Sequence, residues 1–122
     1  MVIFVGMIAP NELRIGNYIL DSLTNETIIV DLDTFNYIKN GRDAYNPIPI
    51  TEDILLKCGV IKHGSEWQIE HNGTAFIFEG SLDHGYYYTG GEGCKLSRLF
   101  YNLHELQNMF HSLTGEELNV IL

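Results

Sequence analysis

The chain has 122 residues, of which 45% are hydrophobic and 19% charged, and this balance predicts a single globular domain over residues 1–122 and excludes a disordered chain. Seven Lys and Arg against sixteen Asp and Glu give a formal charge of −9, and the basic residues form no run. Direct binding of DNA or RNA is disfavoured, because it normally begins with neutralisation of phosphates by basic side chains.

The first nine residues, MVIFVGMIA, are apolar. They are too few to span a bilayer, and no basic residue precedes them as in a signal peptide. We therefore expect no membrane association and a cytoplasmic protein, with residues 1–6 as an extension of the domain.

Residues 17–32, NYILDSLTNETIIVDL, hold two runs of β-branched and aromatic residues around a polar stretch from Asp21 to Glu26. This pattern predicts an antiparallel pair of strands. Residues 34–39, TFNYIK, are predicted to form a third strand that ends at Asn40-Gly41. Short strands with close turns favour a curved antiparallel sheet, part of it an SH3-like barrel.

The segment YNPIPITEDILLKCG changes this pattern. Pro47 and Pro49 keep the chain extended, and Thr51 is a natural N-cap for a short central helix over about residues 51–58. Gly59 is suited to end that helix.

WQIEHNGTAFIF predicts a β-hairpin, because Asn72-Gly73 supplies the two positive-φ positions of a type I′ turn. A two-residue loop fixes the register, so the sequence also predicts which residues pair. One side of the hairpin carries the pairs Trp67–Phe78, Ile69–Phe76 and His71–Thr74, and the other carries Gln68–Ile77 and Glu70–Ala75. The aromatic side is expected to face the core, with His71 at its rim.

A second helix is predicted over about residues 102–114, begun by Asn102 with Glu105 and ended by Gly115. At about 100° per residue one face is an apolar stripe of Leu103, Leu106, Met109, Phe110 and Leu113. His104, Gln107 and His111 are expected at its polar margin, and Glu105, Asn108 and Ser112 in water. With strands, a helix, a hairpin and a helix in this order, the fold class is α+β.

His104 and His111 share a face of this helix but lie about 10 Å apart along its axis, since the rise is about 1.5 Å per residue. One metal ion needs its ligands within about 2 Å, so direct chelation by this pair is not expected. His63, His71 and His84 lie near turns. The sequence therefore predicts no metal ligands and no cofactor.

Cys58 and Cys94 are the candidates for a nucleophile, and His84 or His104 could serve Cys94 as a base. Cys58 lies on the inner face of the central helix and is expected in the core, whereas Cys94 follows a glycine-rich loop and is expected to be more exposed. No motif supports either pairing, so the sequence assigns no catalytic residue. The run Tyr86-Tyr87-Tyr88 is interpreted as a packed strand or a protein contact surface.

Three segments, NELRIGNYIL (11–20), NPIPITEDILLKCG (46–59) and NLHELQNMFHSLTGEEL (102–118), together resemble an uncharacterised family of small proteins encoded in prophages and mobile elements of anaerobic gut bacteria. They cover about a third of the chain and come in the family's order. The resemblance implies no activity, cofactor or catalytic residue. Val60 and His111 depart from the family pattern, in which an aromatic residue is usual at the first and an aromatic or small apolar residue at the second.

These observations favour a non-enzymatic accessory or interaction protein of a prophage or mobile element, acting through a protein partner. A homo-oligomer is compatible with the same features. Two alternatives are a small Cys/His hydrolase-like or metal-dependent enzyme, and a nucleic-acid-associated or DNA-mimic protein.

Overall fold

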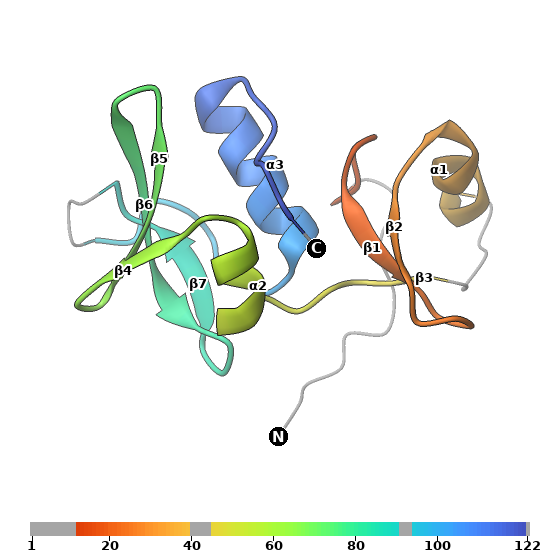
Figure 1. Ribbon diagram of the computed structural model, residues 1–122, viewed down its shortest axis with the longest axis horizontal. Helices are drawn as coiled ribbons and strands as arrows, with labels where there is room; N and C mark the ends of the chain where they lie inside the picture. Colours follow the sequence, from red (N-terminus) through yellow and green to blue (C-terminus); the bar gives the residue numbers. More distant parts are fainter. Residues whose placement is uncertain (1–11, 40–44, 91–93, 122) are drawn as a thin grey trace.

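The computed structural model describes residues 12–39, 45–90 and 94–121. Within them the chain forms a three-stranded sheet, a four-stranded sheet and three helices, so the fold is α+β. Both sheets are open and antiparallel. The helix α3 lies between them, and α1 lies outside the smaller sheet (Figure 1). The proposed extension, residues 1–6, lies outside the described residues.

The three-stranded sheet has the order β2-β1-β3. Its strands are β1 (Tyr18–Asp21), β2 (Thr27–Ile29) and β3 (Tyr45–Asn46). Tyr18 pairs with Ile29 and Leu20 with Thr27, so the predicted antiparallel pair is confirmed.

The prediction of a third strand over residues 34–39 is wrong, because these residues belong to the helix α1 (Leu32–Lys39). The Thr34 N–H donates to Asp31 Oδ1 over 2.8 Å, so Asp31 begins the helix as an N-cap residue does. Thr34 and Ile38, four residues apart, are both buried on one side of the helix. Ile38 joins Leu13, Ile19 and Val30 in a small hydrophobic cluster between α1 and the sheet. The apolar residues of TFNYIK fit the helical spacing as well as the strand spacing, and the cap decides between them.

The helix α2 (Glu52–Lys57) confirms the predicted short central helix. Thr51 is its N-cap, and its hydroxyl accepts the Ile54 N–H over 3.2 Å. Leu55 is fully buried, which fixes the face that α2 turns to the core.

The four-stranded sheet has the order β4-β5-β6-β7. Its strands are β4 (Ile61–His63), β5 (Glu66–His71), β6 (Thr74–Ser81) and β7 (Gly85–Tyr88). The register of β5 and β6 pairs Trp67 with Phe78, Ile69 with Phe76 and His71 with Thr74, as the sequence predicts. Asn72 and Gly73 both have positive φ, at 49° and 79°. The two-residue turn therefore determined the whole pairing.

The helix α3 (Leu103–Thr114) also confirms its prediction. Glu105 accepts hydrogen bonds from the Asn102 N–H at the start, and Gly115 ends the helix with a left-handed φ of 76°. Leu103, Leu106 and Phe110 are buried in the large hydrophobic core against the four-stranded sheet. Leu113, predicted for the same stripe, is 51% exposed and does not belong to the core.

Candidate interaction cleft

A cleft of about 630 Å³ opens between the end of α2, the end of β5 and the segment that follows α3. We call it the α2–α3 cleft, and it is lined by residues of 56–59, 69–71 and 116–119 together with Phe110 and Ile121. These segments lie far apart in the sequence and meet because α2 and α3 pack on the same face of the four-stranded sheet (Figure 1).

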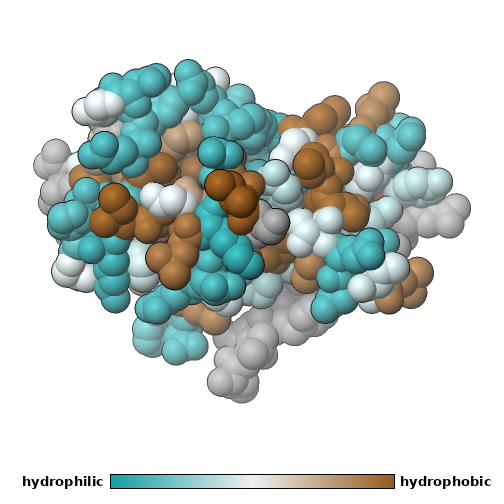
Figure 2. All heavy atoms as spheres, in the orientation of Figure 1, coloured by the Kyte–Doolittle hydropathy of each residue, from teal (hydrophilic) through white to brown (hydrophobic). Residues whose placement is uncertain are grey.

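The floor of the cleft is apolar. Ile69, Phe110 and Leu118 line it, and each is buried. Exposed apolar side chains continue the lining outward, since Leu56 is 70% exposed and Ile121 is 72% exposed. Figure 2 shows exposed apolar groups among polar ones over α2 and the C-terminal segment. A ligand in the cleft would therefore gain contact with apolar surface.

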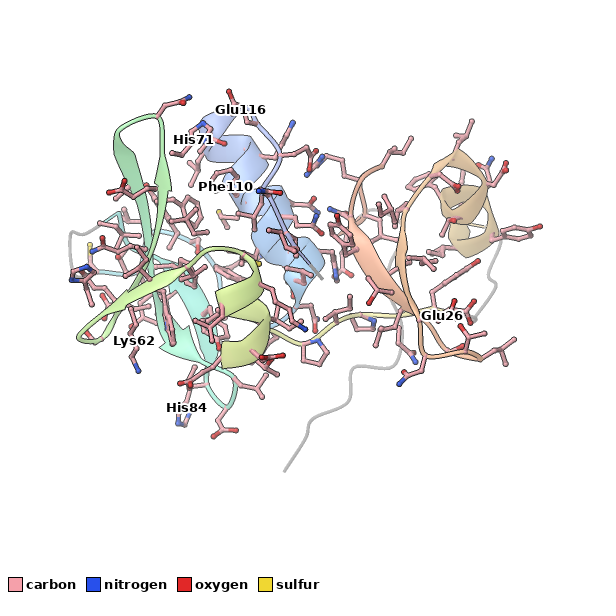
Figure 3. The ribbon with its side chains drawn as sticks, viewed as in Figure 1. Glu26, Lys62, His71, His84, Phe110 and Glu116 are labelled. Carbon is pink, nitrogen blue, oxygen red and sulfur yellow. The ribbon has the colours of Figure 1, made fainter. Side chains whose placement is uncertain are left out.

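His71 and Glu116 meet at one end of the cleft (Figure 3). His71 Nε2 lies 3.3 Å from Glu116 Oε2, a contact that is an ion pair only when the imidazole is protonated. The ring of His71 stands edge-on to Phe110, with ring centroids 5.3 Å apart. The rim position predicted for His71 is thus confirmed. Its contact with Glu116 could not be predicted, because it depends on where the chain turns after α3.

The other charged groups of the cleft differ in how they are held. Glu117 is bound by the guanidinium of Arg14, whose Nη2 donates to Oε2 over 3.3 Å. Lys57 Nζ lies 3.4 Å from Asp53 on the same helix. Glu70 is exposed and also lines the cleft, but it belongs to the side of the hairpin opposite Ile69 and His71. The residues of the lining therefore include three glutamates and one lysine.

Cys58 lies in the floor of the cleft and is 5% exposed. Burial raises the pKa of its thiol to about 12. The thiol is therefore protonated at neutral pH, whereas the nucleophilic form of cysteine is the thiolate. Cys58 serves as a small apolar residue of the core, as the sequence predicts.

The proposed pairings of Cys94 do not find support in the geometry. Cys94 is exposed, whereas His104 is 2% exposed and neither of its ring nitrogens has a hydrogen-bond partner among the described residues. His84 lies in the exposed turn between β6 and β7, where its backbone N–H donates to Ser81 Oγ over 3.2 Å (Figure 3). A catalytic pair of Cys94 with His104 is therefore not present.

The expectation that His104, Gln107 and Asn108 lie at or beyond the polar margin of α3 is wrong. His104 and Gln107 are fully buried, and burial lowers the pKa of His104, an effect that Glu105 and Glu12 partly oppose. These residues occupy a second face of α3, which packs against β1. A helix between two sheets is buried on two sides. The apolar stripe in the sequence indicates only the side that packs in the hydrophobic core, because the second side carries polar residues.

This second face is a polar seam, formed by Gln107 and Asn108 with the segment from residue 12 to residue 18. The Gln107 amide accepts the Tyr18 N–H over 2.8 Å and donates to the Gly16 carbonyl over 3.3 Å. Asn108 accepts from Asn17 Nδ2 over 2.8 Å and donates to the Glu12 carbonyl over 2.7 Å. The signal in the sequence was that this face of α3 carries neutral polar side chains and no Lys, Arg, Asp or Glu.

The Tyr86-Tyr87-Tyr88 run is a packed strand, as interpreted from the sequence. Tyr86 is 2% exposed, and its hydroxyl donates to the Ile50 carbonyl over 3.1 Å. Tyr88 packs on Phe76, with ring centroids 5.0 Å apart. Tyr87 points to the other face, where Lys95 Nζ lies 5.1 Å from its ring.

The three segments that carry the family resemblance contact one another in space. The polar seam and the Arg14–Glu117 pair join the first segment to the third. The second segment meets the third at Ile48, whose carbonyl accepts the Leu103 N–H over 2.7 Å. These hydrogen bonds give the residues that make them a role in holding distant parts of the fold together.

Within the described parts of the chain, no group of three or more His, Cys, Asp or Glu residues could hold a metal ion. No helix there is long and apolar enough to cross a membrane. Comparison of the chain with protein-family models, curated proteins and solved structures found no match.

Proposed function

We propose that this protein is a non-enzymatic interaction protein that holds a segment of a partner protein in the α2–α3 cleft. The observation that carries the proposal is the composition of the cleft: a buried apolar floor, exposed apolar side chains at Leu56 and Ile121, and carboxylates around them. Apolar surface surrounded by polar groups is the general composition of protein interfaces.

The resemblance to proteins of prophages and mobile elements supports a role in a bacterial cell. The cytoplasm is the compartment that suits the cysteines, since Cys58 and Cys94 are both free thiols and Cys94 is exposed. Exposed thiols persist in a reducing compartment and are oxidised outside it.

Site-specific photo-crosslinking in cells that carry the gene tests the proposal. A photo-reactive amino acid is placed at Leu56 and, in a second variant, at Ile121, both of which are exposed in the cleft. Leu23 is the matched control, because it is 88% exposed and lies in the turn between β1 and β2. We expect the two cleft positions to crosslink to the same protein, identified by mass spectrometry, and Leu23 not to. Crosslinks of equal yield from Leu23, or none from the cleft, would contradict the proposal.

A further inference from the structure

The chain runs back along α3 after that helix ends, and reaches α2 (Figure 1). We call this segment, residues 116–121, the strap. It has no regular secondary structure, and it supplies several residues of the lining of the α2–α3 cleft. We propose that two copies of this chain exchange their straps to form a dimer, in which each cleft is completed by the strap of the other copy. The proposal concerns how the cleft is built and does not depend on what binds in it.

The strap is anchored in the rest of the domain by alternate side chains. Leu118 and Val120 are 5% and 8% exposed and belong to the large hydrophobic core. Glu117, Asn119 and Ile121, which alternate with them, are exposed. This alternation is typical of an extended segment that turns one face to a core. The groove under the strap therefore fits this sequence, and the strap of a second copy has the same sequence.

The polar contacts of the strap are made to parts of the chain that lie far away in the sequence. Near its start, Arg14 Nη2 donates to Glu117 Oε2 over 3.3 Å. At its end, the Ile121 N–H donates to the Lys57 carbonyl over 2.9 Å. Neither contact depends on the covalent link between α3 and the strap, so the same contacts form within one copy or between two. An exchange of such an element gives a dimer at low cost.

The link between α3 and the strap is short. Gly115 ends the helix with a φ of 76°, and the Glu116 N–H donates to the Thr114 hydroxyl over 3.2 Å, so the chain reverses at these residues. Short hinges favour exchange between copies. A short hinge also requires the ends of the two α3 helices to lie close together in the dimer. Leu113, in the last turn of α3, is 51% exposed, and its burial between the two helices would stabilise the dimer.

Two charge reversals at the Arg14–Glu117 pair test the exchange. Arg14→Glu places two carboxylates together when the strap lies in its own groove, and Glu117→Arg places two guanidinium groups together. The homodimer of either variant has the same repulsion. When one variant exchanges straps with the other, both pairs become opposite in charge. The full-length variants are therefore mixed and their dimers are counted by native mass spectrometry.

We expect the heterodimer of the two variants to be about tenfold more abundant than either homodimer. General attraction between the chains does not explain such a result, because both variants keep a net negative charge. A mixture without the heterodimer, or with the heterodimer in the proportion that random pairing gives, would overturn the inference. If either charge variant fails to fold, a pair of glycine variants provides the test.

Gly115 and Gly59 are matched positions, which follow α3 and α2 with φ of 76° and 73° and have no atom within 4 Å of an added Cβ. Alanine disfavours this backbone conformation, so both substitutions destabilise the turn in which they lie. In Gly115→Ala a straightened link relieves the strain and carries the strap away from its own groove. By sedimentation equilibrium we expect an association constant about tenfold above that of the wild-type protein for Gly115→Ala and no increase for Gly59→Ala. A monomeric Gly115→Ala variant, or equal dimer formation by both variants, would overturn the inference.

Discussion

His104 is a histidine in a fully buried position, 2% exposed, with neither ring nitrogen hydrogen-bonded among the described residues. Burial disfavours the charged imidazolium and lowers the pKa of His104 below the ordinary histidine value of 6.5. Glu105 and Glu12 act in the opposite direction without reversing this effect. His104 is therefore a neutral packing residue of α3, and its protonation opposes folding.

The pH dependence of stability follows from this lowered pKa. Below pH 6.5 the unfolded chain takes up a proton at His104 more readily than the folded chain does, so stability falls as the pH falls from 6.5 toward the folded-state pKa. Well above pH 6.5 His104 is neutral in both states and contributes no pH dependence. We expect His104→Leu to reduce the loss of stability between about pH 7.5 and about pH 5.5 by up to about 1 kcal/mol, measured by urea unfolding.

The matched control for this prediction is His63→Gln, because His63 is exposed on β4. We expect this variant to keep the pH dependence of the wild-type protein. If the His104→Leu variant and the wild-type protein lose the same free energy of unfolding over this pH range, the prediction that His104 is buried in its neutral form is wrong.

At the scale of elements, α3 is bound to the two sheets by different interactions. Leu103, Leu106 and Phe110 pack in the large core against the four-stranded sheet. Gln107 and Asn108 join the other face to the segment before β1 and to β1 itself through hydrogen bonds. Hydrogen bonds are directional, whereas apolar contact is not. The polar seam therefore determines where along the helix β1 is placed.

Gln107→Ala is expected to destabilise the protein by about 1–3 kcal/mol, because it leaves the Tyr18 N–H and the Gly16 carbonyl without their partner in a part-buried position. The free energy of unfolding in urea measures the effect. Ser112→Ala, at an exposed position of the same helix, is the control and is expected to change stability by less than about 0.5 kcal/mol. Equal effects of the two substitutions would show that the amide bridge contributes nothing.

At the scale of the whole molecule, the described residues form two hydrophobic clusters of unequal size. The larger lies around α2, α3 and the four-stranded sheet, and the smaller contains Leu13, Ile19, Val30 and Ile38 beside α1. Tyr18 and Leu20 of β1 pack against the larger cluster, so β1 contacts both. A strand shared in this way should make the two clusters unfold together.

This arrangement gives a prediction for cooperative unfolding. Trp67 is the single tryptophan and lies in the larger cluster, so its fluorescence reports on that cluster, whereas far-UV circular dichroism reports on both. We expect the two urea transitions to coincide in the wild-type protein. In Arg14→Ala/Asn108→Ala, which removes contacts of the seam, we expect the circular dichroism transition to begin at lower urea than the fluorescence transition. Coincident transitions in that variant would contradict the coupling of the clusters through the seam.

The sequence by itself determined the features that depend on neighbouring residues. The Asn72-Gly73 turn determined the pairing of β5 with β6, since a two-residue loop allows one register. Thr51 and Gly115 marked helix ends through hydrogen bonds and backbone angles that are set within a few residues. For the same reason the core positions Trp67, Ile69 and Phe110 could be named in advance.

Only the tertiary structure decided the features that depend on two distant segments. The apolar residues of TFNYIK fit a strand and a helix equally, and their place in α1 is fixed by the small hydrophobic cluster in which Ile38 joins Leu13, Ile19 and Val30. His104 is buried because a second sheet covers α3, which no periodicity within the helix reveals. The α2–α3 cleft is formed by segments up to about 65 residues apart, from α2 to Ile121, so its lining comes together only when the chain folds.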